Sequence, residues 1–455
     1  MLFKETRIMY AWLPEDVHEL NGRREGLLLL LVAAFVFVNG VALSLAVDGA
    51  PLWQHLWGPI VWFLAIAAAH VLLFLFRPQH DPLLLPMFAL LSGWGIILID
   101  RLAVNFMARQ VMWVVLGTAV MLAVTILPRN LRILRRYRYT LLIAGLLLLA
   151  STLLFGVNPS GYGAALWLPV PLPYTGPVFY FQPSELLKLL LVIFLASYFS
   201  EREALLRQSH VKGLRGTFPY LAPLLLMWGF CMLLLVWQRD LGAATLFFIV
   251  FLALLYLATG DRRYVAAGMV LMLLAGIFAY FLFDVVALRV DAWWNPWPDA
   301  LGRAFQIVQS LYAVAAGGLT GQGAGQGFPI YIPVVHSDFV FAAVAEEWGL
   351  TGSLSLVAVF MLLAYRGLRL AMLNRRPFRV YLAAGITLLF SIQALLIMGG
   401  VTKLLPLTGV TLPFISYGGS SMLISSIMFG LLLHMSQEDV PASQRLAIRS
   451  QQSRP

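Results

Sequence analysis

The stretch LLLLLVAAFVFVNGVALSLAV, residues 27–47, decides the fold, because it is an apolar run without a charged residue. A transmembrane helix needs about 20 predominantly apolar residues, and this run has that length. It is too long for the apolar region of a signal peptide and lacks a small-residue cleavage site, and further apolar runs follow it. The run therefore predicts a helix that spans a membrane and is not removed as a signal.

The composition extends this prediction to the whole chain. Of its 455 residues, 61% are apolar and 11% are charged, whereas soluble domains average about 45–50% apolar and 25% charged residues. We therefore expect an all-α polytopic membrane protein and exclude a soluble globule. About twelve transmembrane helices are predicted, at residues 27–47, 57–76, 83–99, 110–127, 140–157, 185–200, 219–237, 241–259, 264–284, 338–365, 380–400 and 413–436.

The distribution of Lys and Arg sets the expected orientation, since cytoplasmic loops carry an excess of both. With the N-terminus in the cytoplasm, basic clusters such as 128–139 and 366–379 also fall on the cytoplasmic side. Both termini are then cytoplasmic, and the net charge of +10 needs no nucleic-acid partner. Lys188 falls inside a span, and six basic residues fall in outer segments: Arg101, Arg109, Arg239, Arg289, Arg303 and Lys403.

Two outer segments, 158–184 and 285–337, are unusually long connections. Loops of more than about 12–15 residues are usually functional or disordered, and these two contain many aromatic and apolar residues, such as WWNPWP at 293–298. We expect structured, partly re-entrant caps on the outer face. The glycine-rich run GGLTGQGAGQGFP (317–329) matches no phosphate-binding loop, so we expect flexible backbone beside a substrate channel.

Ionisable residues inside a membrane protein are costly and mark functional sites by default. The first outer stretch that contains them is QPSELLK (182–188), in which Pro183 suits the first turn of a helix. Glu185 and Lys188 are three residues apart, so they share a helix face and can pair. They form either a polar site at the outer end of an inner cavity or a structural ion pair.

The second stretch, WQRDLGAA (237–244), lies between two apolar runs with no room for a longer loop. Its Asp240 suits the cap of the helix that follows. The alternative is a contact with substrate, in which the neighbouring Arg239 would share.

The third stretch is PVVHSDFVFAAVAEEWG (333–349), which holds His336, Asp338 and two glutamates. Asp338, or the serine before it, could cap the helix expected near Phe339. The fully apolar part begins only at Trp348, however, so the preceding residues fit an outer cavity better than lipid. A carboxylate there, beside a histidine, is a reasonable general base.

Five elements, in order, resemble the SEDS family of cell-wall proteins, the RodA, FtsW and SpoVE group, and especially a longer RodA-like branch. Each motif is weak alone, but five in order with this topology are highly specific. The elements are QPSELLK (182–188), QRDLGAA (238–244), FQIVQSLYAVAAGGLTGQGAGQG (305–327), HSDFVFAAVAEEWGLTG (336–352) and LLPLTGVTLPFISYGGSS (404–421).

The resemblance implies a domain organisation. Members of the family more usually have ten spans, so residues 83–436 are expected to form a ten-helix core. Residues 27–82 would then be a two-helix N-terminal extension, and residues 1–26 and 437–455 would be cytoplasmic tails.

The resemblance also implies an activity. Such proteins are peptidoglycan glycosyltransferases, which polymerise lipid II, an undecaprenyl-diphosphate disaccharide-pentapeptide, at the outer face of the bacterial cytoplasmic membrane for cell elongation or division. They work with a class B penicillin-binding protein that crosslinks the strands. The family's essential aspartate falls on Asp338. Its membrane-embedded Glu and Lys fall on Glu185 and Lys188, and the aspartate of its Q-x-D-L-G motif falls on Asp240.

Inversion in one step at an anomeric carbon requires a base for the attacking hydroxyl and a positive charge for the departing diphosphate. We expect Asp338 to be the base and His336 to be a supporting residue. The charge would come from Arg239, Arg303 or Lys403, or from a divalent cation such as Mg²⁺ or Mn²⁺, although the sequence shows no dedicated metal cage. A lipid II flippase and a non-catalytic scaffold for a cell-wall synthase remain alternatives.

Overall fold

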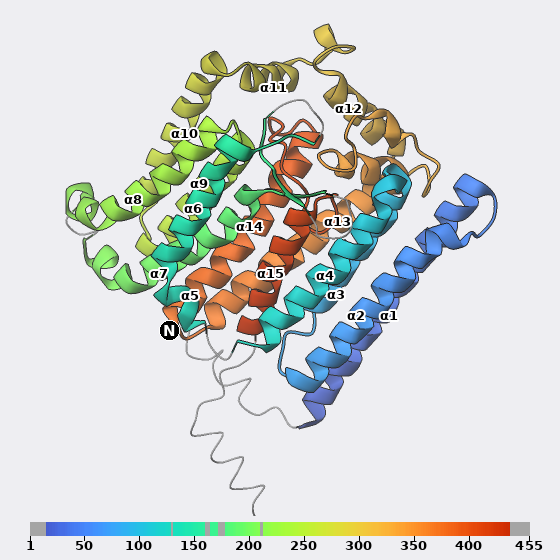
Figure 1. Ribbon diagram of the computed structural model, residues 1–455, viewed down its shortest axis with the longest axis horizontal. Helices are drawn as coiled ribbons and strands as arrows, with labels where there is room; N and C mark the ends of the chain where they lie inside the picture. Colours follow the sequence, from blue (N-terminus) through green and yellow to red (C-terminus); the bar gives the residue numbers. More distant parts are fainter. Residues whose placement is uncertain (1–14, 129–130, 160–163, 172–177, 210–212, 437–455) are drawn as a thin grey trace, which may run out of the picture.

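The computed structural model describes residues 15–128, 131–159, 164–171, 178–209 and 213–436, and the apolar runs form a bundle of helices (Figure 1). The α-helices are α1 (Glu15–Asp48), α2 (Trp53–Phe76), α3 (Leu84–Leu102), α4 (Met107–Ile126), α5 (Arg132–Arg136), α6 (Arg138–Phe155), α7 (Pro183–Ser209), α8 (Gly213–Trp237), α9 (Leu241–Thr259), α10 (Arg262–Leu282), α11 (Asp284–Trp294), α12 (Phe305–Gly317), α13 (Val340–Leu373), α14 (Pro377–Val401) and α15 (Gly419–Met435). The 3₁₀ helices are η2 (Val104–Phe106), η4 (Trp297–Asp299) and η5 (Pro329–Tyr331), and the strands are β1 (Leu168–Pro171) and β2 (Val178–Phe181).

The polytopic all-α prediction is confirmed, with 78% of residues in helices and 2% in strands. Within the described residues, ten helices are long and apolar enough to cross a membrane. Two shorter apolar helices, Ala222–Trp237 and Gly419–Met435, coincide with the remaining two predicted spans. Every predicted run therefore contains a helix, but the last begins at Gly419, since residues 413–418 form turns. A count of twelve membrane crossings stays a prediction.

The burial of the helices differs sharply and separates an inner from an outer layer. In the apolar windows of α3 and α7, 89% of residues are buried, against 6% in α10. Helices α6, α8, α9 and α14 all pack against α7. Glu185 and Lys188 on α7 are therefore buried among other helices, which is the arrangement that ionisable groups inside membrane proteins require.

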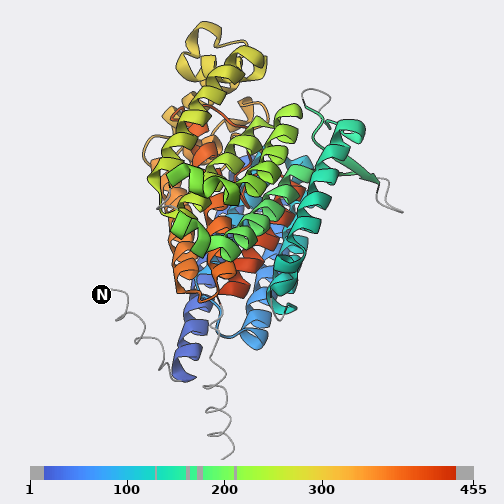
Figure 2. The same ribbon diagram turned by 90° about the vertical axis from the view of Figure 1, so that its left-hand side faces the viewer.

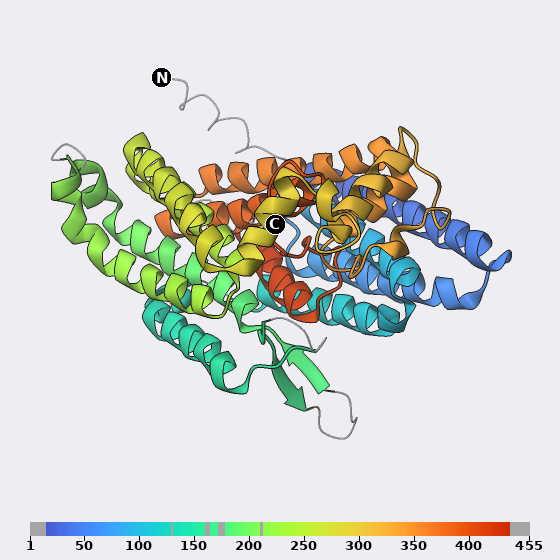
Figure 3. The same ribbon diagram turned by 90° about the horizontal axis from the view of Figure 1, so that it is seen from above.

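The two-helix N-terminal segment lies at one edge of the bundle. Helix α1 packs on α3, and α2 packs on α4 (Figure 3). Its position beside the two helices that follow it in the chain leaves the interior of the bundle to α3, α7 and α14.

Both long outer segments contain ordered structure, as predicted, within their described residues. In 158–184, strands β1 and β2 form an antiparallel hairpin that projects sideways (Figure 2), in the register Leu168 with Phe181. In 285–337, α11 and α12 lie over one end of the bundle (Figure 1). That these segments re-enter the membrane stays a prediction.

The described chain begins and ends at the same end of the bundle. The start of α1 and the end of α15 lie opposite α11 and α12 (Figure 1), and the Ser436 hydroxyl accepts a hydrogen bond from the Asp81 N–H at 3.1 Å. Residues 1–14 and 437–455, most of the two predicted cytoplasmic tails, lie outside the described residues.

Candidate functional site

Asp338 lies in the turn that leads into α13, near Arg289 on α11. Helix α13 begins at Val340, and no side-chain hydrogen bond caps it, so the capping explanation for Asp338 is wrong. Its carboxylate Oδ1 accepts a hydrogen bond from the Ser337 hydroxyl at 2.7 Å, and the residue is half-buried. The carboxylate is therefore not used as a helix cap and is available for chemistry.

The loop before α15 holds this turn in place. The Ser416 hydroxyl donates to the Ser337 carbonyl at 2.6 Å, and the Tyr417 N–H donates to the His336 carbonyl at 2.9 Å. The His336 ring also lies 5.3 Å from the Phe106 ring, which stacks on Tyr417. Burial lowers the pKa of His336 and so favours its neutral form, and the imidazole packs as an aromatic ring against Phe106 and Tyr417.

Arg289, on α11, faces Asp338 across Gly409. A Cβ atom at Gly409 would lie 3.0 Å from Arg289 Nη2 and 3.6 Å from Asp338 Oδ2. Gly409 has a φ of 72°, which a glycine adopts without strain. Arg289 Nη1 donates to the Thr408 carbonyl at 3.1 Å. The guanidinium and the carboxylate thus both lie close to the loop 408–409.

The charges of this group act on one another. Burial raises the pKa of Asp338, and the Ser337 hydrogen bond and the Arg289 charge oppose that rise. Burial lowers the pKa of Arg289, and the charges of Asp338 and Asp240 oppose that fall. An aspartate whose pKa is raised is a stronger base than a solvated one.

Arg289 has no special place in the sequence-based prediction, where it is one of six outer basic residues. Its partner Thr408 lies 119 residues away, so no local pattern joins them. The one local indication in the sequence is that the apolar residues Leu288 and Val290 flank Arg289. This pattern favours a helix that packs against other parts of the protein.

Asp240 caps α9, as its position in a tight turn predicted. Its Oδ1 accepts a hydrogen bond from the Ala243 N–H at 3.2 Å. Burial raises its pKa, while hydrogen bonds from Ser184 and from the Ala243 N–H oppose that rise. Gly242 lies so close to the Thr408 carbonyl that a Cβ atom would collide with it. This capped turn therefore supports the loop that carries Gly409.

Glu185 and Lys188, on α7, form the ion pair that their spacing predicted. Lys188 Nζ lies 2.6 Å from Glu185 Oε2, and the two residues are 4% and 7% exposed, respectively. Lys188 also donates to Gln393 Oε1 at 3.2 Å, and Gln393 Nε2 donates to the Thr411 carbonyl at 2.6 Å. A buried polar network therefore runs from α7 through α14 to the loop that carries Gly409.

Removing one member of this pair should cost more stability than removing both. We expect Lys188→Met to destabilise the protein by about 3–5 kcal/mol, because Glu185 would be left as a buried, uncompensated charge. The double variant Glu185→Gln/Lys188→Met should lose less, and thermal unfolding of the purified proteins measures both. Arg303→Met is the matched control, since it breaks an exposed ion pair with Asp299 and should change stability by less than about 1 kcal/mol. Equal losses in the single and double variants would contradict the prediction.

The three basic residues that the sequence suggested for a diphosphate clamp lie elsewhere. Arg303 is 73% exposed and pairs with Asp299 at 3.3 Å. Arg239 is exposed in the turn between α8 and α9, and Lys403 follows α14 with a φ of 60°. Among the described residues, no hydrogen bond or ion pair joins any of them to Asp338.

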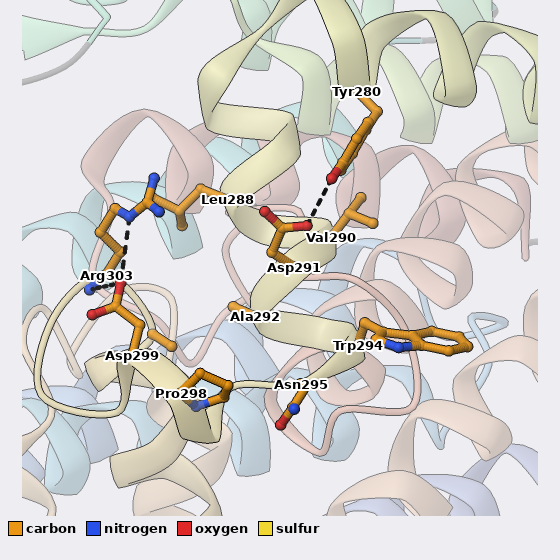
Figure 4. A pocket seen from close by; sticks show the side chains of 11 residues that line it. Tyr280, Leu288, Val290, Asp291, Ala292, Trp294, Asn295, Pro298, Asp299 and Arg303 are labelled. Atoms are coloured by element: carbon orange, nitrogen blue, oxygen red, sulfur yellow. Dashed lines mark hydrogen bonds and ion pairs between the residues drawn. The ribbon is translucent and has the colours of Figure 1, made fainter.

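A pocket of about 500 Å³ lies along α11, and neither Asp338 nor Arg289 is among its lining residues (Figure 4). It is lined mainly by α11, with residues from α10, η4 and the turn before α12, and it contains two side-chain pairs, Tyr280 with Asp291 and Asp299 with Arg303. Arg289 is not among the lining residues and reaches toward Thr408 instead. Helix α11 therefore separates this pocket from Asp338.

The glycine-rich run has a packing role that the sequence did not predict. Helix α13 is broken at Gly349, which has φ 65° and ψ −160°, and the run supplies hydrogen bonds across the break. The N–H groups of Gln322 and Gly323 donate to the carbonyls of Glu346 and Glu347, each at 2.9 Å. A Cβ atom at Gly321 would collide with the Glu347 carbonyl. Close packing against α13, in place of the expected flexible backbone, accounts for this glycine.

The two glutamates before the break hold the same run through their side chains. Glu346 Oε1 accepts from the Phe328 N–H at 2.7 Å, and Glu347 Oε2 accepts from the Gly325 N–H at 3.1 Å. Arg101, at the end of α3, pairs with Glu347 Oε1 at 3.0 Å. Both side chains are thereby bonded to the glycine-rich run.

Asp338, Asp240 and Arg289 do not by themselves form a metal cage. No group of three or more His, Cys, Asp or Glu side chains that could hold a metal occurs in the part of the chain that the structure describes. Asp338 and Asp240 both lie near the Arg289 guanidinium. A hard cation takes six or more oxygen ligands, and two carboxylates alone supply too few, while the guanidinium is the group here that suits an anionic substrate.

A family model described as a cell cycle protein, that of FtsW, RodA and SpoVE, matches residues 82–440. Among curated proteins, the peptidoglycan glycosyltransferase RodA of Mycobacterium tuberculosis is 36% identical over 431 residues, covering 91% of this chain and 90% of that protein. The probable peptidoglycan glycosyltransferase FtsW of Geobacter metallireducens is 37% identical over 336 residues, covering 73% of this chain and 84% of that protein.

Solved structures show the same architecture. A chain from a structure described as "Structural coordination of polymerization and crosslinking by a peptidoglycan synthase complex" superposes with a TM-score of 0.65 and 29% identity, covering 80% of this chain and 99% of that chain. The rod shape determining protein RodA of Thermus thermophilus superposes with a TM-score of 0.57 and 26% identity, covering 79% and 98%.

Proposed function

This chain belongs to the FtsW, RodA and SpoVE family and is a peptidoglycan glycosyltransferase of the bacterial cytoplasmic membrane, and we propose that it polymerises lipid II with Asp338 as general base. The observation that carries the proposal is that Gly409 lies close both to the half-buried carboxylate of Asp338, which does not cap a helix, and to the Arg289 guanidinium. One group can accept a proton, and the other can stabilise a departing anion. These are the two needs of glycosyl transfer from a diphosphate.

The reaction is a single inverting displacement. A hydroxyl oxygen of the acceptor sugar attacks the anomeric carbon of the growing strand, and the bond from that carbon to the diphosphate oxygen breaks. The hydroxyl proton passes to Asp338, whose raised pKa suits proton transfer. The diphosphate leaves with the electron pair of the broken bond, and Arg289 is placed to stabilise the resulting negative charge through paired N–H donors.

The buried pair on α7 supports this centre from below. Glu185 and Lys188 join Gln393 and the Thr411 carbonyl, two residues after Gly409. We assign them the role of fixing the loop that carries Gly409, without contact to the reacting atoms. Asp240 does the same through the α9 cap and Gly242.

A divalent cation, if the reaction uses one, would be held mainly by the diphosphate. Mg²⁺ keeps several waters and binds through substrate phosphates with one or two carboxylates. Asp338 and Asp240 are the carboxylates near that position, and Arg289 lies near both of them. The protein's own fixed positive charge is therefore the arginine.

The partner we propose is a class B penicillin-binding protein that crosslinks the new strands. The support is the structural neighbour from a peptidoglycan synthase complex, in which polymerisation and crosslinking are coordinated. A scaffold without catalysis would need no base beside a guanidinium, so we rank it below the polymerase.

The test of the function is the product made from lipid II. Purified protein with labelled lipid II should yield glycan oligomers, sized on a gel, and the Asp338→Ala protein should yield none. A flippase would move lipid II between leaflets of a vesicle and form no oligomer. Relocated but unpolymerised lipid II with the wild-type protein would contradict the proposed function.

A further inference from the structure

Helix α1 holds the segment that carries the proposed base, although the family model begins only after α2. We infer that α1 is a positioning element for Asp338, and that it acts through Asn39 and its hydrogen bond to Trp348. This inference rests on the proposed role of Asp338 and adds a regulator of its position from outside the ten-helix core.

The first step is the break in α13. The segment Val340–Trp348 follows Asp338 directly and spans about 12 Å at 1.5 Å per residue. It ends at Gly349, where the backbone leaves the helical conformation. A rigid segment between Asp338 and a break transmits any shift at Trp348 to the carboxylate, because packed helical turns move as units.

The second step is the contact between α1 and that break. Trp348 Nε1 donates to Asn39 Oδ1 at 3.0 Å, and Asn39 Nδ2 donates to the Phe35 carbonyl at 2.8 Å. Both ends of the Asn39 amide are thereby used and its orientation is fixed. Trp94, on α3, lies edge-on to both Phe35 and Trp348, at 5.2 and 5.6 Å between ring centroids.

The third step is the contact between α1 and the glycine-rich run. A Cβ atom at Gly325 would lie 3.0 Å from Ala46 Cβ and 3.1 Å from Leu43 Cδ1. With a spacing of four, four and three residues, Phe35, Asn39, Leu43 and Ala46 share one face of α1. One face of this helix thus supports both the break and the run that bridges it.

The fourth step is the anchoring of α1 at both ends, to α2 and α3 through His55 at one end and to α2 and the connection between α2 and α3 through Glu25 at the other. At the outer end, His55 lies 2.7 Å from Asp100 on α3 and 2.8 Å from Asp48 on α1. At the other end, Glu25 contacts both His70 and His80, at 2.9 and 2.7 Å. Asp100 precedes Arg101, which itself binds Glu347. Helix α1 therefore has a fixed place relative to α13.

The experiment compares Asn39→Leu with Val38→Ala in the full-length protein. Val38 is the neighbouring residue, and its side chain is 67% exposed on the surface of the bundle. The Val38→Ala protein should therefore match the wild type in exchange rate and in kcat. Asn39→Leu leaves the indole N–H without its acceptor. We expect hydrogen exchange of the amides in 334–348 to become about 2- to 10-fold faster, because the loss of one hydrogen bond changes an opening equilibrium by about that factor.

The catalytic arm measures lipid II polymerisation by the same proteins. We expect kcat to fall about 10-fold in Asn39→Leu with KM unchanged, because a displaced base slows the chemical step and leaves binding intact. In a Trp348→Phe background, Asn39→Leu should add nothing, since its partner is already lost. Faster exchange, lower kcat and this non-additivity together support the inference.

Two results would overturn it. One is an Asn39→Leu protein with a lower melting temperature but with exchange and kcat equal to those of Val38→Ala, which is a structural role alone. The other is faster exchange with an unchanged kcat, which shows that the segment moves without consequence for the reaction. The exchange arm does not depend on the glycosyltransferase assay, so failure of the proposed function and failure of this inference give different results.

Discussion

Asp338→Asn should lower the rate of lipid II polymerisation by about 10²- to 10⁴-fold, the usual contribution of a general base. The asparagine amide has nearly the same shape, and its oxygen can still accept the Ser337 hydrogen bond. It cannot accept the proton of the attacking hydroxyl. The loss should therefore appear in kcat, with a smaller change in KM, in an assay that sizes the glycan products.

The pH dependence gives the same assignment a second test. Asp338 must be ionised to act as a base, so the rate should fall as the pH is lowered through its pKa. Burial raises that pKa. The acid limb of the pH–rate profile, where the rate falls as the pH is lowered, should therefore lie at higher pH than for a solvated aspartate. The residual rate of Asp338→Asn should lack this limb.

Ser337→Ala is the matched control for both measurements. The Ser337 hydroxyl stabilises the ionised carboxylate and so lowers the pKa of Asp338. Its removal should shift the acid limb further toward high pH while most of the plateau rate remains. If Asp338→Asn polymerised lipid II at the wild-type rate with a wild-type melting temperature, Asp338 would not be the base.

Contacts that are local in the chain could be predicted from the sequence. Glu185 and Lys188 pair because a spacing of three places them on one helix face, and Asp240 caps α9 because it precedes an apolar run in a tight turn. The membrane-spanning helices could also be predicted from the sequence. A backbone in lipid must satisfy its own hydrogen bonds, and a long apolar run does so only as a helix. Each of these results depends on a few consecutive turns of chain.

The features that were missed depend on residues far apart in the chain. The break at Gly349 exists because the glycine-rich run supplies hydrogen bonds to it, and Arg101 reaches Glu347 across 246 residues. The hairpin of β1 and β2 was missed for another reason. Two prolines lie within the four residues of β1, and proline in a strand usually argues against that assignment except at an edge. A two-stranded hairpin consists only of edges.

The site shows the same division between local and distant contacts. The sequence and its family resemblance single out Asp338, but they leave three basic residues as candidates for the clamp and omit the one that faces it. Arg289 reaches the centre only because α11 lies over the end of the bundle and the loop 408–409 passes between them. A cap helix can lie in many directions, and its own sequence does not specify which helices it covers.

Arg289→Met should lower kcat by about 10²- to 10³-fold, which is the usual loss when one donor to a developing anion is removed. The negative charge on the diphosphate oxygen grows as the bond to the anomeric carbon breaks. The guanidinium therefore stabilises the transition state more than it stabilises the bound substrate. Most of the loss should therefore appear in kcat. The variant should also shift the acid limb to higher pH, because Arg289 lowers the pKa of Asp338.

Arg289→Lys separates charge from geometry at the same position. The ammonium keeps the positive charge near Asp338, so the acid limb should stay close to that of the wild type. It lacks the planar fork that binds two oxygens at once, so only part of the rate should return. A lysine variant as slow as the methionine variant, with an unshifted limb, would show that paired donors matter more than charge.

Arg303→Met is the control that distinguishes this clamp from the one suggested by the sequence. Arg303 lies on the same outer segment, but it is exposed, pairs with Asp299 and lines the pocket on the other side of α11. Its loss should leave the polymerisation rate within about twofold of the wild type, since an exposed ion pair contributes little. If Arg303→Met lost the activity and Arg289→Met kept it, the diphosphate would leave by the outer pocket, and Asp338 would face the wrong side of α11 to act as its base.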